Sequence, residues 1–572
     1  MARRVNIPFP LSSFPGVNPQ EGAGRLINCH AEPLGEPAKP TAPAPIVWRG
    51  SAGLSQHAFT AENSYRGGLQ VKNLAYEVFA SNVLTVDATG NGKTILGPML
   101  GTKKVSLARN QAGNPDVVAV DVDNGAFALT TAGVPSAPAA YNGGGNLPQP
   151  IAVAFQDGYF FFMIADCRVF ASGLNALTQN SLTFITLQAK ADVTGMRPIP
   201  FSGVMLFFTS GSCEVWQDAA NPAPAFPYAR STVLEYGLAQ PSAIAGFEVG
   251  FSELLWVAQD FGVYWMSPGS LAPIKVSPTE LDLLIEAQVK AGQLLDARCY
   301  VEGGKKFWVI SSPAWSWEFK LSTRKWNERV SLVGGQYVRW RATGGHPAFN
   351  RWITGDTQSG NLLYDDVTNY TENGSPLLFR LESGPVREFP QESRIARADF
   401  DVDTGVGQVA GNYQMTVLGA AAGTGGVVRL TVDQTSRAVS GDQALVAGVT
   451  GTVEANGTYP MRVVDQNHIE LIGTVFVHAY VSGGIVTDAT APQGATAPQC
   501  AISCSKNGGR TFDVPSIRPI GAQGKERRTR VSVKNRGQAG PQGVRWRIDI
   551  TDPVYRAVKG GTMSDDPRDV SP

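Results

Sequence analysis

The feature that most constrains the fold of this chain is a recurring pair of short apolar strands joined by a tight turn. Examples are LAYEVFASNVLTV at residues 74–86 and ELLWVAQDFGVYWM at residues 253–266. Seven such hairpins turn near residues 81, 124, 166, 211, 260, 313 and 359. A multi-strand unit every roughly 40–50 residues is the spacing of β-propeller blades. The repeat predicts an all-β fold with a propeller over residues 61–380, of six or seven blades with six favoured. Stacked β-sandwiches are the alternative architecture.

The composition supports many short strands joined by turns. Glycine (63 residues) and proline (38 residues) make up about 18% of the 572 residues, against roughly 12% in an average protein. Hydrophobic residues account for 43%, which argues against disorder. WSWEFKL at residues 315–321 alternates apolar and polar side chains and predicts a strand buried on one face. Only Thr279–Gly292 is typical of a helix, with Thr279 as its N-cap.

The charge and apolar patterns exclude several classes of protein. Lysine plus arginine and aspartate plus glutamate each number 48, so no global field draws the chain to nucleic acid or membrane. The N-terminus lacks the apolar stretch of a signal peptide. The longest apolar run, near Tyr159–Ala165, is far shorter than the roughly 20 residues of a membrane-spanning helix. The six cysteines lack a zinc-site spacing, and we expect reduced, buried thiols made in a cytosol.

The pattern changes after about residue 380. We expect a C-terminal β-domain at residues 381–403 and 499–560, interrupted by a small β-module at residues 404–498 that contains no lysine. An insertion of this kind is tolerated when its two ends lie close together on the host domain. Residues 1–60 are expected to form an N-terminal arm and docking segment, and residues 561–572 a flexible acidic tail.

Two short motifs resemble ligand loops but fit hairpin turns better. Gly92-Lys93-Thr94 ends like a phosphate-binding loop, yet Asp87 occupies the position of its first glycine and Pro98 prevents the helix that should follow. Asn91-Gly92 instead predicts a hairpin turn. DVDNG at residues 121–125 lacks the glycine and glutamate positions of a calcium loop. The five histidines show no metal-ligand spacing, and neither a catalytic constellation nor a cofactor motif is found, so we expect no enzyme, no metal and no cofactor.

One basic stretch is a candidate site. In the predicted strand at residues 528–536 the basic residues share one face, opposite Val531 and Val533, and in the next strand two arginines alternate with Trp546 and Ile548. This face is either solvated, a subunit contact, or a surface near nucleic acid phosphates in a DNA channel. The residues are Arg528, Arg530, Lys534, Arg536, Arg545 and Arg547.

The order of several motifs resembles a known family. FPGV (Phe14–Val17), RLINCHAEP (Arg25–Pro33) and GSAGL (Gly50–Leu54) are similar to the opening of the tail hub, or packaged-DNA stabilisation, proteins of short-tailed phages. The block from Ser503 to Val554, with SCSKNGGRTF, GKERRTRVSVKNRG and VRWRIDITDPV, resembles the closing β-domain of phage tail proteins. VTGTVEANGTYPMRVVDQNHIELIG at residues 449–473 looks like a small β-module of tail and baseplate proteins. The inserted module departs from the simpler hubs.

The resemblance implies a structural subunit rather than an enzyme. Such subunits form a hexameric ring that extends the portal and adaptor channel, retains packaged DNA, anchors tailspikes or tail fibres and forms part of the ejection conduit. The expected location is the virion tail, after assembly in the bacterial cytoplasm. The proline-rich segment Glu32–Ile46 would suit docking to a neighbouring subunit.

Two other functions stay open at this point. The chain could be a carbohydrate-binding or carbohydrate-cleaving propeller acting on the host cell surface, which requires a tryptophan-lined pocket with two carboxylates about 5–10 Å apart. It could also be a monomeric binding scaffold within the host cell.

Overall fold

The computed structural model describes residues 4–35, 45–60, 62–90, 92–131, 133–143, 147–222, 224–387, 392–407, 413–435, 438, 440–489, 496–523 and 530–566. The chain divides into two compact units. The propeller unit comprises His57–Ser316 and Arg339–Asp365. The sandwich unit comprises Met1–Gln56, Trp317–Val338 and Asp366–Pro572.

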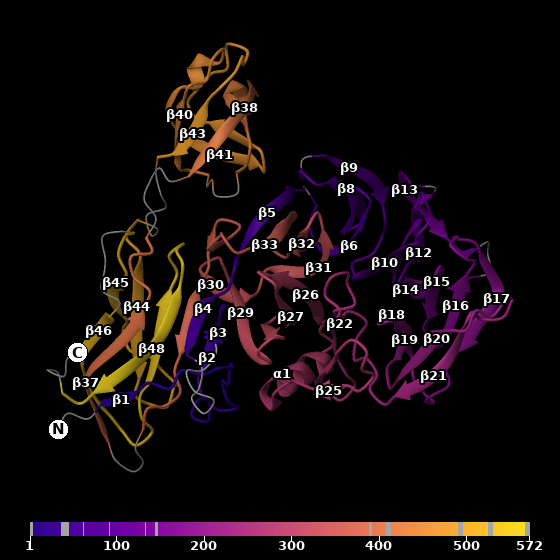
Figure 1. Ribbon diagram of the computed structural model, residues 1–572, viewed down its shortest axis with the longest axis horizontal. Helices are drawn as coiled ribbons and strands as arrows, with labels where there is room; N and C mark the ends of the chain where they lie inside the picture. Colours follow the sequence, from indigo (N-terminus) through magenta and orange to yellow (C-terminus); the bar gives the residue numbers. More distant parts are fainter. Residues whose placement is uncertain are drawn as a thin grey trace. The chain divides into compact units, whose positions relative to one another are not determined.

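Five four-stranded antiparallel sheets follow one another along the propeller unit, as the sequence repeat predicts (Figure 1). Consecutive strands pair within each sheet, so every sheet is built from local hairpins. The sheets are β6 (Tyr65–Val71), β7 (Leu74–Phe79), β8 (Asn82–Asp87) and β9 (Lys93–Pro98); β10 (Val105–Arg109), β11 (Val117–Asp121), β12 (Gly125–Thr131) and β13 (Val134–Tyr141); β14 (Pro150–Gln156), β15 (Tyr159–Ile164), β16 (Arg168–Ser172) and β17 (Gln179–Thr186); β18 (Gly195–Phe201), β19 (Val204–Thr209), β20 (Cys213–Asp218) and β21 (Tyr228–Leu234); and β22 (Ile244–Ala245), β23 (Leu254–Val257), β24 (Val263–Met266) and β25 (Ile274–Lys275).

Helix α1 and two further strand groups complete the unit. Helix α1 (Thr279–Lys290) confirms the predicted helix, but Pro278 rather than Thr279 holds the N-cap position, because Thr279 already has helical geometry. A proline tolerates the start of a helix, where the missing N–H has no partner to lose. The strand groups are β26 (Asp296–Glu302) with β27 (Lys305–Ser311), and β31 (Ala342–Ala348), β32 (Arg351–Asp356) and β33 (Asn361–Asp366) with β5 (Gly53–Phe59) beside β33.

The first strand of each group lies on the inside of a ring. Strand β6 contacts β10 and β31, β10 contacts β14, β14 contacts β18, and β26 contacts β22 and β31. Between β18 and β22, Arg197 Nη1 donates to the Pro241 carbonyl at 3.1 Å and its guanidinium lies 5.0 Å from the centroid of Phe247. The described residues therefore give seven inner strands in a closed circle, the higher of the two expected numbers.

The two ligand-like motifs lie at hairpins, as predicted. Strands β8 and β9 pair in antiparallel register, with Val86 opposite Lys93. Asn91 lies outside the described residues, and Lys93 Nζ donates to the Phe59 carbonyl. Strands β11 and β12 pair across the turn after Asp121, whose carboxylate bonds the buried Arg66.

The sandwich unit contains two β-sheets that share one apolar core. The first has the order β3 (Cys29–Pro33), β4 (Ile46–Gly50), β48 (Ala557–Ser564), β37 (Ser393–Val402) and β46 (Arg530–Ala539), with β1 (Arg4–Asn6) beside β48. The second contains, in order, β28 (Ser316–Lys320), β29 (Lys325–Val333), β2 (Arg25–Ile27), β36 (Phe379–Glu382), β47 (Arg545–Ile550), β44 (Gln499–Ser505) and β45 (Ser516–Pro519), with β30 (Gln336–Arg339) beside β29. Two short strands, β34 (Thr371–Glu372) and β35 (Ser375–Pro376), form a hairpin.

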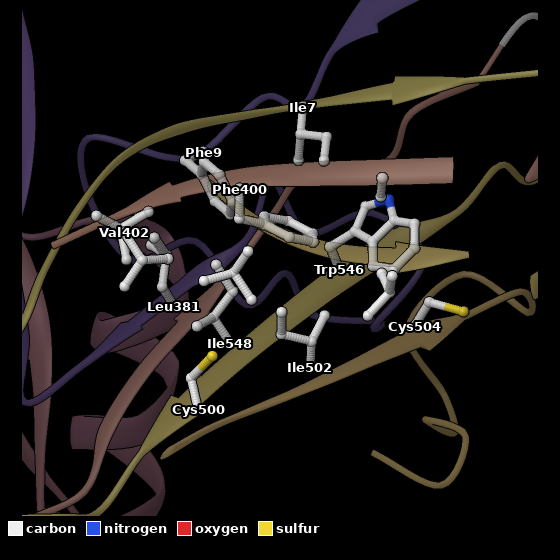
Figure 2. Packing of buried hydrophobic residues seen from close by; sticks show 14 of the residues in the cluster. Ile7, Phe9, Leu381, Phe400, Val402, Cys500, Ile502, Cys504, Trp546 and Ile548 are labelled. Atoms are coloured by element: carbon white, nitrogen blue, oxygen red, sulfur yellow. The ribbon is translucent and has the colours of Figure 1, made fainter. Parts of the chain in front are cut away.

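Side chains from both sheets meet in this core (Figure 2). Phe400 from β37 packs against Trp546 from β47, with ring centroids 5.4 Å apart. Phe9 packs in the same way against Trp48, again at 5.4 Å. Cys500 and Cys504 point into the core as free thiols. Burial of these large rings is the main stabilisation of the sandwich, since each aromatic side chain removes about 150–250 Å² from water.

The strands and compact units depart from three of the expected domain boundaries. Residues 4–50 are not only a docking arm, because β1 to β4 are built into the sandwich sheets, although residues 36–44 of the proline-rich segment lie outside the described residues. Residues 317–338 belong to the sandwich unit rather than to the propeller. Residues 561–564 belong to β48, with Met563 in the core, so the expected tail begins later. Strands of three to five residues carry too little periodicity to be recognised from sequence.

The inserted module is a closed six-stranded barrel, in agreement with the predicted β-module. Its strand order is β38 (Gln414–Ala422), β39 (Val428–Val432), β42 (His468–Leu471), β41 (Gly457–Asp465), β40 (Gln443–Ala447) and β43 (Ile485–Asp488). Two 3-10 turns, Thr424–Gly426 and Val453–Ala455, lie in its loops. Closure leaves no strand edge unpaired, and the interior is filled by the barrel's own apolar side chains.

A buried polar cluster lies where the first and last inner strands meet. His346 from β31 places Nε2 3.3 Å from Glu77 Oε1, and Nδ1 3.3 Å from the Tyr65 hydroxyl. Gly68 is required there, because a Cβ at that position would lie 2.0 Å from Glu77 Oε2. Burial raises the pKa of Glu77 well above its usual range. Burial, reinforced by His57, lowers the pKa of His346 to about 3. His346 is therefore uncharged at neutral pH, and burial disfavours the charged form of Glu77 beside it.

Within this cluster, His346 contributes a loss of stability in mild acid, and the raised pKa of Glu77 opposes that loss. Between pH 6.5 and about 3 the unfolded chain takes up a proton at His346 that the folded chain does not, so the contribution of His346 to the free energy of unfolding falls as the pH falls. The contribution of Glu77 has the opposite sign above about pH 4.5, because there the folded chain keeps a proton that the unfolded chain releases. The limiting slope from one such histidine is about 1.4 kcal/mol per pH unit. We expect His346→Gln to remove roughly 2 kcal/mol of the loss between pH 6.5 and 4.5, measured as denaturant midpoints followed by tryptophan fluorescence.

The matched control is Thr458→Gln in the barrel, at an exposed position without a titratable side chain. Its pH profile should match that of the unsubstituted protein. An unchanged acid slope in His346→Gln would contradict a buried, uncharged histidine at the ring closure.

Candidate functional site

The basic residues singled out in the sequence do not share one face. Strand β46 pairs with β37, whereas β47 lies between β36 and β44 in the other sheet. Val533 from β46 and Ile548 from β47 both point into the common core (Figure 2 labels Ile548). Because neighbouring side chains on a strand point to opposite faces, the arginines of the two strands lie on opposite sides of the sandwich.

The outer face of the β47 sheet carries paired charges. Arg547 Nε donates to Glu382 Oε1 at 2.8 Å, and its guanidinium lies 3.5 Å from the centroid of Phe512. Burial lowers the pKa of Arg547, although the nearby Glu382 opposes this shift. Two further ion pairs lie on the same face, at 2.5 Å and 2.8 Å: Arg25–Glu328 and Arg380–Asp549. Each of these three arginines therefore has its own carboxylate.

Arg545 holds the N-terminal loop in place. It is only 6% exposed, and its Nη2 donates to the Gly22 carbonyl at 2.5 Å and to the Gln20 carbonyl at 3.2 Å. Burial lowers the pKa of Arg545, since its environment removes water from the guanidinium. Arg545 is thus a structural residue beneath the FPGV turn rather than a contact for phosphate.

The basic residues of β46 differ in their surroundings. Arg536 is engaged: its Nη1 donates to Asp513 Oδ2 at 2.9 Å and its Nη2 to Ser516 Oγ. Arg530 lies opposite Asp401 of β37, and the exposed Lys534 lies opposite Arg397. Arg528 lies outside the described residues. Arg530 and Lys534 are the members of the predicted set that remain on a solvent-facing side.

A polar hollow of about 530 Å³ lies on this same outer face. Gly560 of β48 is one of its lining residues, and an added Cβ there would meet nothing within 4 Å. Arg4 from β1 approaches Asp399 Oδ2 at 3.7 Å, and Arg530 and Asp401 stand on the neighbouring strands. The remaining lining residues are Asn6, Ile7, Phe400, Lys559, Gly561 and Thr562. Charges of both signs line the hollow, so it selects neither an anion nor a cation by field alone.

The described residues were compared with what a sugar-binding or metal-binding site requires. None of the 11 tryptophans is exposed, and the hollow contains none of them. Among the described residues no group of three histidine, cysteine, aspartate or glutamate side chains could hold a metal ion. No described helix is long and apolar enough to cross a membrane.

A comparison with known protein families shows which family the chain belongs to. A family model described as "Bacteriophage P22 Gp10, beta-propeller", of the phage stabilisation proteins, matches residues 37–368. The chain belongs to this family. Membership makes the chain a phage structural protein, and it agrees with the ring of sheets in the propeller unit and with the family resemblance of the sequence motifs.

Solved structures show distant similarity to this stabilisation protein. The WD40 β-propeller domain of Doa1 covers 55% of this chain and 97% of its own, at 8% identity and a TM-score of 0.36. The computationally designed Ika8 protein covers 55% and 100%, at 12% identity and a TM-score of 0.31. These similarities are too distant to say anything about function. A search of curated proteins finds no match.

Sequence reasoning missed the hollow and its acidic wall. The alternation in ARADFDVDTG places Arg397, Asp399 and Asp401 on the outward face of β37, with Ala398 and Phe400 in the core. This alternation could have been recognised in the sequence. The pairing of β37 with β48 could not, because the two strands are about 160 residues apart in the chain. This pairing places Gly560 beside Asp401.

The two basic environments predict different effects of substitution. We expect Arg545→Met to destabilise the protein by about 1–3 kcal/mol, because it leaves the buried carbonyl of Gly22 without a donor. Lys534→Met, at an exposed position, should stay within about 0.5 kcal/mol of the unsubstituted protein. The measurement is chemical denaturation of both variants. Equal stability of the two would mean that Arg545 does not clamp the loop.

Proposed function

We propose that this stabilisation protein is a subunit of the tail hub, or nozzle, ring of a short-tailed phage. In this role it extends the portal and adaptor channel, retains packaged DNA, anchors tailspikes or tail fibres and forms part of the ejection conduit. It acts in the virion tail, after assembly in the bacterial cytoplasm, as a homo-oligomer that we expect to be a hexamer. Its role is structural and needs neither cofactor nor metal.

The family match over residues 37–368 carries this proposal. The placement of charge supports it. Ion pairs cover the outer face of the β47 sheet, and a buried pair joins Arg341 to Asp356 in the propeller at 2.6 Å. Removing one partner of a buried pair costs about 3–5 kcal/mol, so such pairs hold geometry fixed. Fixed geometry serves a subunit that must withstand the pressure of packaged DNA.

A ring made of identical subunits requires a head-to-tail contact that closes on itself. The exposed apolar side chains of Phe14 and Val17, in a turn anchored by Arg545, are suited to such a contact. The alternative function is a carbohydrate-binding or carbohydrate-cleaving propeller. None of the described tryptophans is exposed, so they give this alternative no support.

The oligomeric state tests the ring. We expect the purified chain to form a species of about 365 kDa, six times the 60.8 kDa subunit, by sedimentation equilibrium or by imaging of rings with six-fold symmetry. A protein that stays monomeric at all concentrations, and is absent from purified virions, would overturn the hub assignment.

DNA retention tests the role of the β46 face. We propose that Arg530 and Lys534 face the packaged DNA and bind phosphates without sequence preference. Particles assembled with Lys534→Glu should form in normal number but lose DNA several times faster in moderate salt, measured as nuclease-accessible DNA over time. The matched control is Lys103→Glu, at an exposed lysine of the propeller that pairs with Asp123 at 2.8 Å. Equal DNA loss in both variants would remove β46 from the channel.

A further inference from the structure

The inserted barrel has one wall without charge. On adjacent strands β38, β43 and β40, alternate residues fill the interior and the others point outward. Three of the outward residues are large, aliphatic and exposed: Leu418 (59%), Leu445 (43%) and Ile485 (47%). All eight outward positions of these strands in the paired region are uncharged: Gln414, Thr416, Leu418, Gln443, Leu445, Ala447, Ile485 and Thr487. We call this set the uncharged wall.

The three aliphatic residues form one cluster. Ile485 pairs with Thr416 on one side and with Ala447 on the other. Leu418 and Leu445 therefore lie on the diagonals from Ile485, which are about 7–8 Å positions on a sheet and within reach of long side chains. A cluster of exposed aliphatic side chains on a regular sheet face is typical of a protein contact.

The opposite wall of the same barrel is built differently. Glu470 on β42 accepts hydrogen bonds from Arg429 on β39 at 2.7 Å and from Arg462 on β41. Hydrogen bonds from the Thr424 amide and from these two arginines outweigh burial and lower the pKa of Glu470 to about 2. The charged side chains of this wall thus pair with one another, whereas the uncharged wall carries no charge to pair. This contrast singles out the side that binds.

The area of the uncharged wall limits how strongly it can bind a partner. Three strands at about 4.8 Å spacing and five residues at about 3.4 Å give a surface of roughly 240 Å². A stable pairwise interface buries about 800 Å² on each partner. The wall can therefore act only beside other contacts, as it would between subunits that a ring already holds together.

A matching surface is present on the propeller unit. Strands β9 and β13 contact each other at the rim of the first two sheets, where a Cβ on Gly97 would lie 3.3 Å from Pro138. Ile95 (64% exposed) and Val134 (65% exposed) project from this rim. All residues of β13 are uncharged, and most are exposed: Val134, Pro135, Ser136, Ala137, Pro138, Ala139, Ala140 and Tyr141. The two prolines prevent a further strand from pairing at this edge, so the rim is suited to contact through side chains.

We propose that the uncharged wall of one copy docks on the β9–β13 rim of a second copy. This inference rests on the proposed ring, because only a heterologous contact of this kind repeats around a closed ring and leaves no surface unused. The occupant is a second copy because the chain itself supplies an exposed, uncharged and aliphatic surface of matching chemistry. Charged partners, DNA included, gain nothing from a wall with no charge.

Charge complementation tests the contact in the full-length chain. Leu445→Glu and Val134→Lys each place a lone charge in the interface, so each should raise the concentration needed for assembly by about tenfold or more. In the double variant the introduced glutamate of one copy can pair with the introduced lysine of the next, which should recover most of the loss. Thr431→Glu, on the charged wall, is the matched control and should assemble normally. All positions are at the surface, so thermal stability should be unchanged in each variant.

Disulfide trapping separates contact between copies from contact within one chain. A mixture of Leu445→Cys and Val134→Cys chains should form a covalent dimer on mild oxidation, and a mixture of Thr431→Cys and Val134→Cys chains should not. The six native cysteines are buried and do not interfere. A disulfide that forms only within a Leu445→Cys, Val134→Cys double variant would overturn the proposal.

The outcomes also separate this inference from the ring itself. If the unsubstituted chain does not assemble at all, the ring fails and the docking contact fails with it. If it assembles and Leu445→Glu assembles equally well, the ring stands and the docking contact is wrong.

Discussion

Closure of the inner ring is the constraint on which the propeller depends. Strand β6 begins at residue 65 and its neighbour β31 ends at residue 348, so the two must meet across almost the whole unit. Bringing such distant segments together costs chain entropy before any contact forms. Burial along seven inner strands offsets that cost only when the circle is complete. The burial of Glu77 and His346 shows that the junction excludes water as fully as the rest of the core.

The sandwich obeys a different constraint, the alternation of side chains along each strand. Its strands come from residues 4–50, 316–339, 379–402 and 499–564, and no local signal joins them. What they share is an apolar residue at every second position, which is sufficient to build one core between two sheets. The same alternation places the charges of β36 and β47 on the face opposite this core. Those charges then find partners on neighbouring strands, as Arg380 does with Asp549.

Local features were therefore predictable and long-range pairings were not. The hairpins, helix α1 and the inserted barrel follow from residues close together in sequence. The WSWEFKL strand shows the limit: β28 is buried on both faces, because Glu318 is covered by Asn327 at 2.8 Å and Arg329 at 3.1 Å. From the sequence alone, the polar face of β28 cannot be distinguished from a solvent-exposed face, because the residues that cover it come from another strand. Arg545 and Arg547 were grouped with β46 for the same reason, since period-two patterning cannot tell which sheet a strand joins.

The distribution of charge distinguishes the two contacts that we propose for this chain. Most charged side chains of the sandwich form ion pairs, whereas Lys534 is exposed on the β46 face. The barrel, in contrast, has a wall that carries no charge. Contacts between cations and phosphates release counterions and weaken steeply as salt rises. Contacts through aliphatic side chains depend on burial and are insensitive to salt or slightly favoured by it. In the ring that we propose, ionic strength therefore acts on the contact with DNA and spares the contact between subunits, which allows the ring to release its genome without dissociating.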